Sequence, residues 1–358
     1  MPFSVSPFNE VDNLVFAQSA YVMLDGILDE EGSMSPAEAA EAFFQKFTRE
    51  EIRENHSLHK DAPFIMEKIG QAKRYEGVRV THYLNVIDEE AEAQISAMAF
   101  EFPDFIYVSY RGTDDSLVGW KEDFTLSFLP ETKGQRMAVE YLNRHFIGSD
   151  KPLMVGGHSK GGNFAVYASA FCDSRIRNRI ERVFSNDGPG FRKEVTKTQE
   201  YRQVLEKVES LLPENTLVGM LFSGKYKHRI VKSSAEGLMQ HDATTWQVLG
   251  ADFVEAETRS EDSYIMDATL RNWLGGLSDK DRIFFTDKLF DLLTKNGATT
   301  LEDLSEGGIG GLLDMLVNMH SLPKEEREEF GGILGNLLRS YWFSVSQSYM
   351  AQVQDEYT

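Results

Sequence analysis

The sequence predicts an α/β fold in which a mostly parallel central sheet is flanked by helices, with further helical segments before and after it. Short apolar or alternating runs typical of strands lie between residues 78 and 232, and stretches with helical spacing separate several of them. Residues 10 to about 70 and several stretches after about residue 258 have helical spacing. We therefore divide the 358 residues into an N-terminal helical segment (1–75), an α/β core (76–257) and a C-terminal helical extension (258–358).

Composition excludes several classes of protein. The formal net charge is −20, so the surface repels phosphate backbones and nucleic-acid binding is disfavoured. The one cysteine, Cys172, allows no intrachain disulfide and supplies no metal cluster. No stretch is apolar enough for a transmembrane segment, and the first ten residues lack the basic start and apolar run of a signal peptide. We expect a cytoplasmic protein.

The N-terminal segment and the first strands have clear patterns. Apolar residues at helical spacing predict a helix in residues 11–28, and Ser35 followed by Pro36 predicts the start of another. Alternating or β-branched runs then predict strands at 78–86, 93–102 and 105–110 that form a meander.

The rest of the chain alternates before becoming helical. We expect strands at 153–155, 182–186, 217–222 and 229–232, and helices at 137–146, 163–170 and 194–211. In the extension we expect helices at 265–274, 281–293, 300–303 and 322–342, with a glycine-rich break at 307–311.

A serine between glycines organises the core. Gly157-His158-Ser159-Lys160-Gly161 lies between an apolar strand and a helix, which is the setting of a nucleophile elbow. So tight a turn requires small neighbours and puts the serine in a backbone conformation that ordinary residues avoid. The alternative is a glycine-rich turn with a bystander serine.

A serine hydroxyl needs a general base. In hydrolases with this turn the order along the chain is serine, acid, histidine. His228 and His241 lie after Ser159 in the strand-rich region. A solvated turn among Lys225, Lys227 and Arg229 explains His228, whereas His241 follows the last strands, where the base is expected.

Three segments together resemble class 3 (fungal-type) lipases. Arg111-Gly112-Thr113 with Trp120 and Asp123 is similar to their Arg-Gly-Ser/Thr … Trp-x-x-Asp segment, and 157–162 is similar to their Gly-His-Ser-Leu-Gly-Gly turn. The segments 186–190 and 240–242 resemble a bacterial branch of largely unassigned function. The resemblance implies an α/β-hydrolase fold, a lipid or acylglycerol substrate, and an oxyanion hole at Thr113 and the backbone N–H of Lys160.

Two features depart from the lipase pattern. Lys160 replaces an apolar residue, and its ammonium either favours anionic substrates or lies on the surface. The lipases place the acid after the strand that corresponds to 217–222, and no carboxylate follows there.

The acid must come from elsewhere, or the triad is incomplete. Asp187 ends the strand after the serine unit and should open on the same side of the sheet as Ser159. Asp242 adjoins His241 and should diverge from its ring, and Glu214 should lie at the opposite sheet end. Glu236 stays open, and an alternative for Asp187 is to cap its own turn.

The predicted function is hydrolysis of a carboxylic ester through an acyl-enzyme on Ser159, with His241 as base, Asp187 as acid and no cofactor or metal. The substrate is then a small-molecule ester or lipid. Residues 114–120 form either a flap over the acyl pocket or a fixed loop. Two other functions stay open: a thioesterase or peptidase at the same site, and an inactive hydrolase-fold binding protein whose C-terminal helices hold a protein partner.

Overall fold

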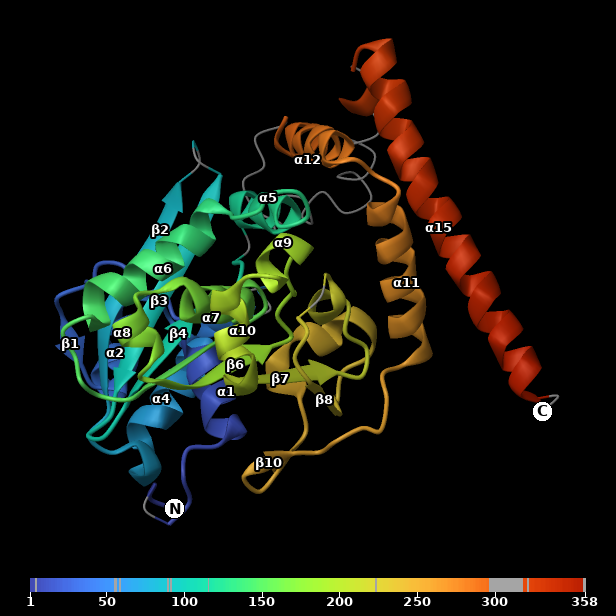
Figure 1. Ribbon diagram of the computed structural model, residues 1–358. Helices are drawn as coiled ribbons and strands as arrows, with labels where there is room; N and C mark the ends of the chain where they lie inside the picture. The colour runs from blue at the N-terminus through green and yellow to red at the C-terminus, as the bar shows by residue number, and fades with distance from the viewer. Residues whose placement is uncertain are drawn as a thin grey trace.

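The computed structural model describes residues 1–358 except 4, 55–56, 58, 89, 91, 115, 223, 296–317, 321 and 357–358. Its centre is an eight-stranded sheet whose strands lie side by side in chain order (Figure 1). Strands β1 to β4 are antiparallel and β4 to β8 are parallel. The predicted meander and mostly parallel sheet are confirmed. The strands are β1 Ser33–Met34, β2 Arg79–Asp88, β3 Ala93–Glu101, β4 Ile106–Tyr110, β5 Leu153–His158, β6 Ile180–Asn186, β7 Val208–Pro213 and β8 His228–Val231.

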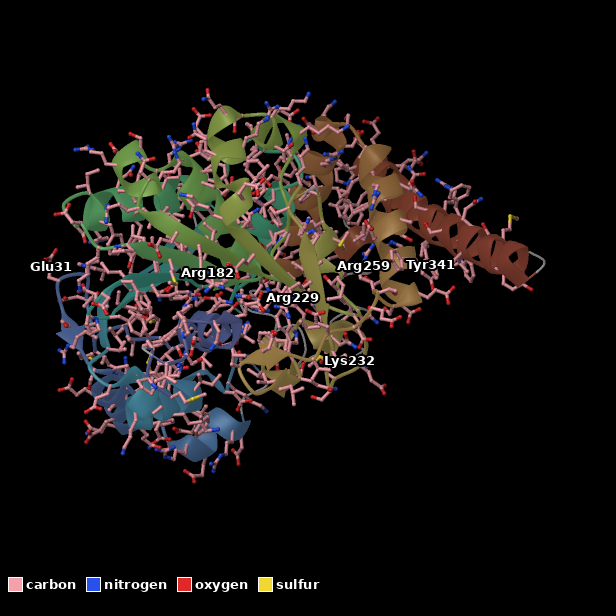
Figure 2. All side chains as sticks on the ribbon, turned by 60° about the horizontal axis from the view of Figure 1, so that its bottom comes forward. Glu31, Arg182, Arg229, Lys232, Arg259 and Tyr341 are labelled. Carbon is pink, nitrogen blue, oxygen red and sulfur yellow. The ribbon has the colours of Figure 1, made fainter. Side chains whose placement is uncertain are left out.

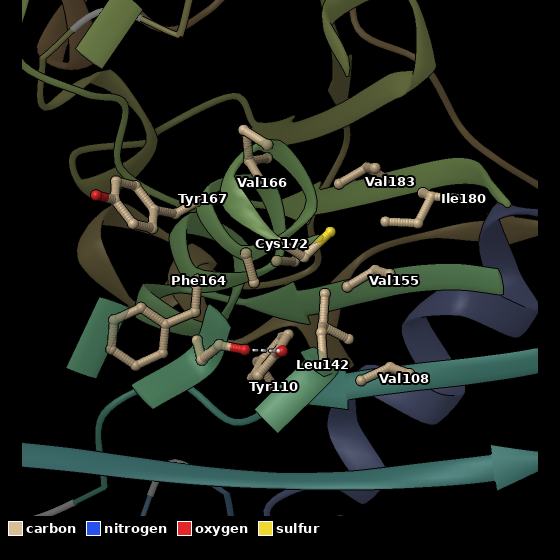
Figure 3. Packing of buried hydrophobic residues seen from close by; sticks show 14 of the residues in the cluster. Val108, Tyr110, Leu142, Val155, Phe164, Val166, Tyr167, Cys172, Ile180 and Val183 are labelled. Carbon is tan, nitrogen blue, oxygen red and sulfur yellow. Dashed lines mark hydrogen bonds between the residues drawn. The ribbon is translucent and has the colours of Figure 1, made fainter. Parts of the chain in front are cut away.

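Helices cover both faces of this sheet. One face carries α6 (Lys133–Phe146), α7 (Lys160–Phe171) and α10 (Gln199–Val204), and the other carries α1 (Glu10–Ser19), α2 (Pro36–Lys46) and α4 (Ala62–Gln71). Figure 3 shows the first interface, where valines of three parallel strands pack beneath α7 and Cys172 is buried among them. Apolar burial on both faces fixes the strands whose ends form the site.

Local sequence explains where these helices begin. Ser35 caps α2, with its hydroxyl accepting the N–H of Glu38 while the Glu38 carboxylate accepts the N–H of Ser35. Pro36 occupies the first turn, where its missing N–H costs nothing. The predicted helix start is confirmed. The remaining short elements are α3 Arg49–Glu54, α5 Leu117–Thr125, α8 Ser174–Arg177, α9 Lys193–Thr196, β9 Val248–Leu249 and β10 Asp252–Phe253.

The region between residues 194 and 222 differs from the expectation. The helix predicted at 194–211 ends at Val204. The next strand in the chain is β7, which pairs with β6 from Val208 onward. The predicted strand at 217–222 is wrong, because this segment contains a 3₁₀ turn, Val218–Met220. The backbone N–H of Gly219 bonds the Asp187 side chain rather than a neighbouring strand.

The described residues of the chain after 258 are mainly helical. These helices include α11 (Glu261–Gly275), α12 (Asp279–Thr294) and α15 (Lys324–Glu356), while 300–303 and 307–311 lie outside the described residues. One side of α15 packs on α11 and α12, through a cluster that contains Trp273 of α11, Phe285 of α12 and Phe330 of α15. Its other side leaves Trp342 and Tyr341 exposed, the latter labelled in Figure 2. In the described part of the chain, no helix is both long and apolar enough to cross a bilayer.

Candidate active site

Ser159 lies in the single-residue turn between β5 and α7. Its φ of 57° and ψ of −132° confirm the expected backbone strain, which only a tightly packed surrounding maintains. A Cβ at Gly157 would collide with the Gly161 carbonyl, and a Cβ at Gly161 would collide with the Tyr110 carbonyl. The Ser159 N–H donates to the Asn186 carbonyl at 2.9 Å, which joins the turn to the end of β6.

Asp187 follows β6 directly and is fully buried, with a positive φ of 48°. Its Oδ1 accepts the Gly219 N–H at 3.1 Å and the hydroxyl of Thr216. Its Oδ2 lies 2.7 Å from His241 Nδ1. Three donors therefore fix this carboxylate, and one of them is the ring of His241.

The contact with Asp187 determines which nitrogen of His241 carries the proton. A carboxylate accepts, so Nδ1 of His241 carries the hydrogen and Nε2 keeps its lone pair. Among the described residues, no hydrogen bond joins Ser159 Oγ to His241. Such contacts are commonly loose in free enzymes and tighten when substrate binds.

The other candidate carboxylates lie elsewhere. Asp242 turns away from the His241 ring, and its Oδ1 accepts the N–H and hydroxyl of Thr244. Glu236 is exposed. The placement of Glu214 was wrong: it follows β7, so it lies at the same sheet end as Ser159. At that end Thr216, two residues on, bonds Asp187.

His158, which the sequence pattern did not single out, contacts both Tyr21 and His241. It is fully buried, and its Nε2 lies 2.8 Å from the carbonyl oxygen of His241 while its Nδ1 lies 3.0 Å from the hydroxyl of Tyr21. A carbonyl only accepts, so Nε2 carries the proton and Nδ1 accepts from Tyr21. Burial and neighbouring His241 lower the pKa of His158 to about 3, so it stays neutral and keeps this pattern near neutral pH.

Thr113 follows β4, which flanks β5 on the side opposite β6 and Asp187. Its hydroxyl donates to Asp123 Oδ2 at 2.5 Å, and its main-chain N–H has no hydrogen-bond partner in the described part of the chain. Burial raises the pKa of Asp123 to about 6, while Lys160 and the Thr113 hydroxyl oppose that rise. The residue before Thr113 is Gly112, and its backbone lies close to Tyr21 and His158. A Cβ at this position would collide with the Tyr21 hydroxyl and the His158 carbonyl.

The expectation that the Lys160 side chain lies on the surface is wrong. The side chain is 1% exposed, and its Nζ lies 3.1 Å from Oε2 of Glu122, which is equally buried. Glu122 also accepts the N–H of Gln94 at 2.9 Å and that of Gly134 at 2.8 Å. An unpaired ammonium is too costly to bury, and Glu122 provides the compensating charge. Lys160 therefore ties the first turn of α7 to α5, β3 and α6.

Residues 114–120, expected as a flap or a fixed loop, mostly form the start of a helix. Ser116 caps α5 by accepting the N–H of Gly119, and Leu117 is buried. α5 also carries Glu122 and Asp123, so one helix holds the side chains of both Lys160 and Thr113.

Comparison with known proteins identifies the family of this chain. A family model described as Mbeg1-like matches residues 69–291, which is more than half of the chain. The chain belongs to the Mbeg1-like family. The matched range contains Ser159, Asp187 and His241 and reaches into α12.

Solved lipases are similar to this Mbeg1-like chain at low identity. M37 lipase is 12% identical with a TM-score of 0.37, covering 60% of this chain and 70% of that one. A deletion mutant of Rhizomucor miehei lipase in complex with its propeptide is 13% identical with a TM-score of 0.35, covering 71% and 73%. No curated protein matches significantly. The chemistry proposed for this Mbeg1-like protein therefore rests on its own residues.

Proposed function

We propose that this protein is a serine hydrolase that cleaves carboxylic esters through an acyl-enzyme on Ser159. The observation that carries the proposal is the 2.7 Å contact between Asp187 Oδ2 and His241 Nδ1, at the sheet end where Ser159 has its strained backbone. The contact leaves His241 Nε2 free to act as a base. Membership of the Mbeg1-like family and the lipase-like motifs are consistent with this chemistry.

In the proposed reaction, Ser159 Oγ attacks the ester carbonyl carbon and passes its proton to His241 Nε2. Asp187 stabilises the resulting imidazolium. The backbone N–H groups of Thr113 and Lys160 hold the oxyanion. Collapse of the intermediate breaks the bond to the alcohol oxygen, which takes the proton from His241, and water then releases the acid by the same route.

The test is reaction of the purified protein with a fluorophosphonate probe, with Ser159→Ala as control. We expect labelling of the wild-type protein that is lost in Ser159→Ala, together with turnover of a short-chain 4-nitrophenyl ester. If the folded wild-type protein neither labels nor turns over, the hydrolase proposal fails and the inactive binding protein becomes the better explanation.

Leaving-group preference separates the remaining alternatives at the same site. The kcat/KM values for an ester, a thioester and an anilide of one acyl group can be compared directly. We expect the ester to have the highest value, and a preference for the thioester or anilide would reassign the enzyme to a thioesterase or peptidase.

A further inference from the structure

A second feature, separate from Ser159, is a cavity of about 610 Å³ between the core and the C-terminal extension. Its core wall comes from residues 191–194 and from residues 217, 219–222, 224 and 225, and its outer wall comes from α11 and α12. This volume lies within the range of small-molecule sites. Gly219 belongs to the wall and also donates to Asp187, so the cavity adjoins the candidate site.

The cavity lining combines apolar and cationic groups. Five cationic and two anionic side chains line it, although the whole chain has a net charge of −20. The cations are Arg192, Lys193, Lys225, Arg271 and Arg282. The apolar lining is contributed mainly by Phe191, Leu217, Met220, Leu221, Leu270 and Leu274. Such a lining matches a ligand with an apolar chain and an anionic end.

Two of the arginines lie close together. Arg192 lies 3.2 Å from the Asp279 carboxylate and 3.3 Å from that of Glu194, and Arg282 lies 3.6 Å from Asp279, so the two guanidinium groups share Asp279 and Arg192 has Glu194 besides. Both also donate to the main-chain carbonyl of Ser127, which brings the two cations together. Burial and the charge of Arg192 lower the pKa of Arg282 in spite of Asp279. An incoming anion would relieve this repulsion.

Lys225 adds a third positive charge at the same wall. It is exposed, has a positive φ of 56°, and has no ion-pair partner among the described residues. An anion bound in the cavity would give this exposed ammonium a partner.

We propose that this cavity binds a single-chain amphiphile with an anionic head group, its chain on the apolar wall and its carboxylate or phosphate at Arg192, Arg282 and Lys225. A fatty acid and an alkyl phosphate share this chemistry. The proposal requires no reaction at Ser159, so it stands or falls independently of the hydrolase proposal.

The test uses the full-length Ser159→Ala protein, which removes turnover. Isothermal titration calorimetry below the critical micelle concentration compares decanoate, decyl phosphate and decanol. We expect one site per chain for an anionic ligand, at least tenfold tighter than for decanol, and an affinity that falls as salt is added. Shortening the bound anion by two carbons should weaken it by roughly tenfold.

Variants locate the binding site. Arg192→Gln and Lys225→Gln should each weaken the anion by roughly tenfold or more, with Arg175→Gln as a matched control on the exposed surface, where it pairs only with Asp173. Lys225→Gln breaks no ion pair, so it keeps the test valid if an arginine variant unfolds. Binding of decanoate alone supports a fatty acid, and binding of decyl phosphate alone supports a phosphorylated lipid. Absence of binding by both anions, or losses no larger than that of Arg175→Gln, overturns the proposal.

Discussion

The ring of His158 donates a hydrogen bond to the main-chain carbonyl of His241 at 2.8 Å. His158 immediately precedes Ser159, so the residue beside the proposed nucleophile holds the backbone of the proposed base. The position of His241 is thereby fixed twice, through its ring by Asp187 and through its carbonyl by His158.

The assignment of the acid gives the sharpest prediction. Asp187→Asn should leave the fold intact and lower kcat by about 10³–10⁴-fold, because an amide favours the wrong tautomer of His241. Asp242→Asn is the matched control and should cost far less, since the Asp242 carboxylate accepts hydrogen bonds from Thr244 and not from the His241 ring among the described residues. Ester hydrolysis with circular dichroism of each variant measures this. Near-normal turnover in Asp187→Asn would reject Asp187 as the acid.

The hydrogen bond between His158 and His241 predicts different effects for two variants. His158→Phe removes the donor and should slow fluorophosphonate labelling by about tenfold or more, in line with the cost of a lost buried hydrogen bond. Tyr21→Phe leaves His158 Nδ1 without its donor and should lower the free energy of unfolding by about 1–3 kcal/mol. Chemical denaturation and labelling rates separate the two effects. Equal labelling rates in His158→Phe and wild type would contradict the positioning role.

The buried pair of Lys160 and Glu122 predicts a loss of stability. Lys160→Met leaves Glu122 unpaired and should lower the free energy of unfolding by about 3–5 kcal/mol. Glu122→Ala should cost at least as much, because it also removes the acceptor for the N–H groups of Gln94 and Gly134. Lys121→Met, which breaks pairs with the more exposed Glu92 and Asp287, is the control. If Lys160→Met is as stable as Lys121→Met, the claim that an unpaired Glu122 destabilises the fold is wrong.

The raised pKa of Asp123 predicts a specific pH dependence. Between about pH 4 and pH 6 the folded protein holds a proton on Asp123 that the unfolded chain has lost. The stabilising contribution of Asp123 is therefore full at low pH and is lost as the pH rises through about 6. Asp123→Asn does not titrate, so its stability relative to wild type should rise by up to about 3 kcal/mol over this range. Parallel stability curves for the two proteins would exclude this titration.

The sequence predicted the sheet where local pattern and burial agree. The elements from β2 to β6 follow their apolar or alternating runs, and the turn at Ser159 follows from Gly157 and Gly161. The error at β7 arose because Val208–Pro213 contains Glu209 and Ser210, whereas 217–222 has no polar side chain. Pairing with β6 selects the first as the strand, and such pairing depends on residues distant in the sequence.

The site was predictable only in part for a similar reason. The chain order of Ser159, Asp187 and His241 indicated three candidate side chains. The roles of His158 and Lys160 depend on Tyr21 and Glu122, which lie 137 and 38 positions away from them. A histidine before the serine and a lysine after it were the available clues, and only the fold identifies their partners.

The hydrogen bond from the Asn13 side chain to the Asn186 side chain joins α1 to the end of β6 across 173 positions. During synthesis, α1 leaves the ribosome long before the strand it will hold, and His241 emerges later still. Contacts so distant along the chain slow folding, because the chain loses conformational entropy in closing a large loop before the contact stabilises it. A nascent chain shorter than about 240 residues contains the proposed nucleophile without its base, so any hydrolytic activity would begin only once the core is nearly complete.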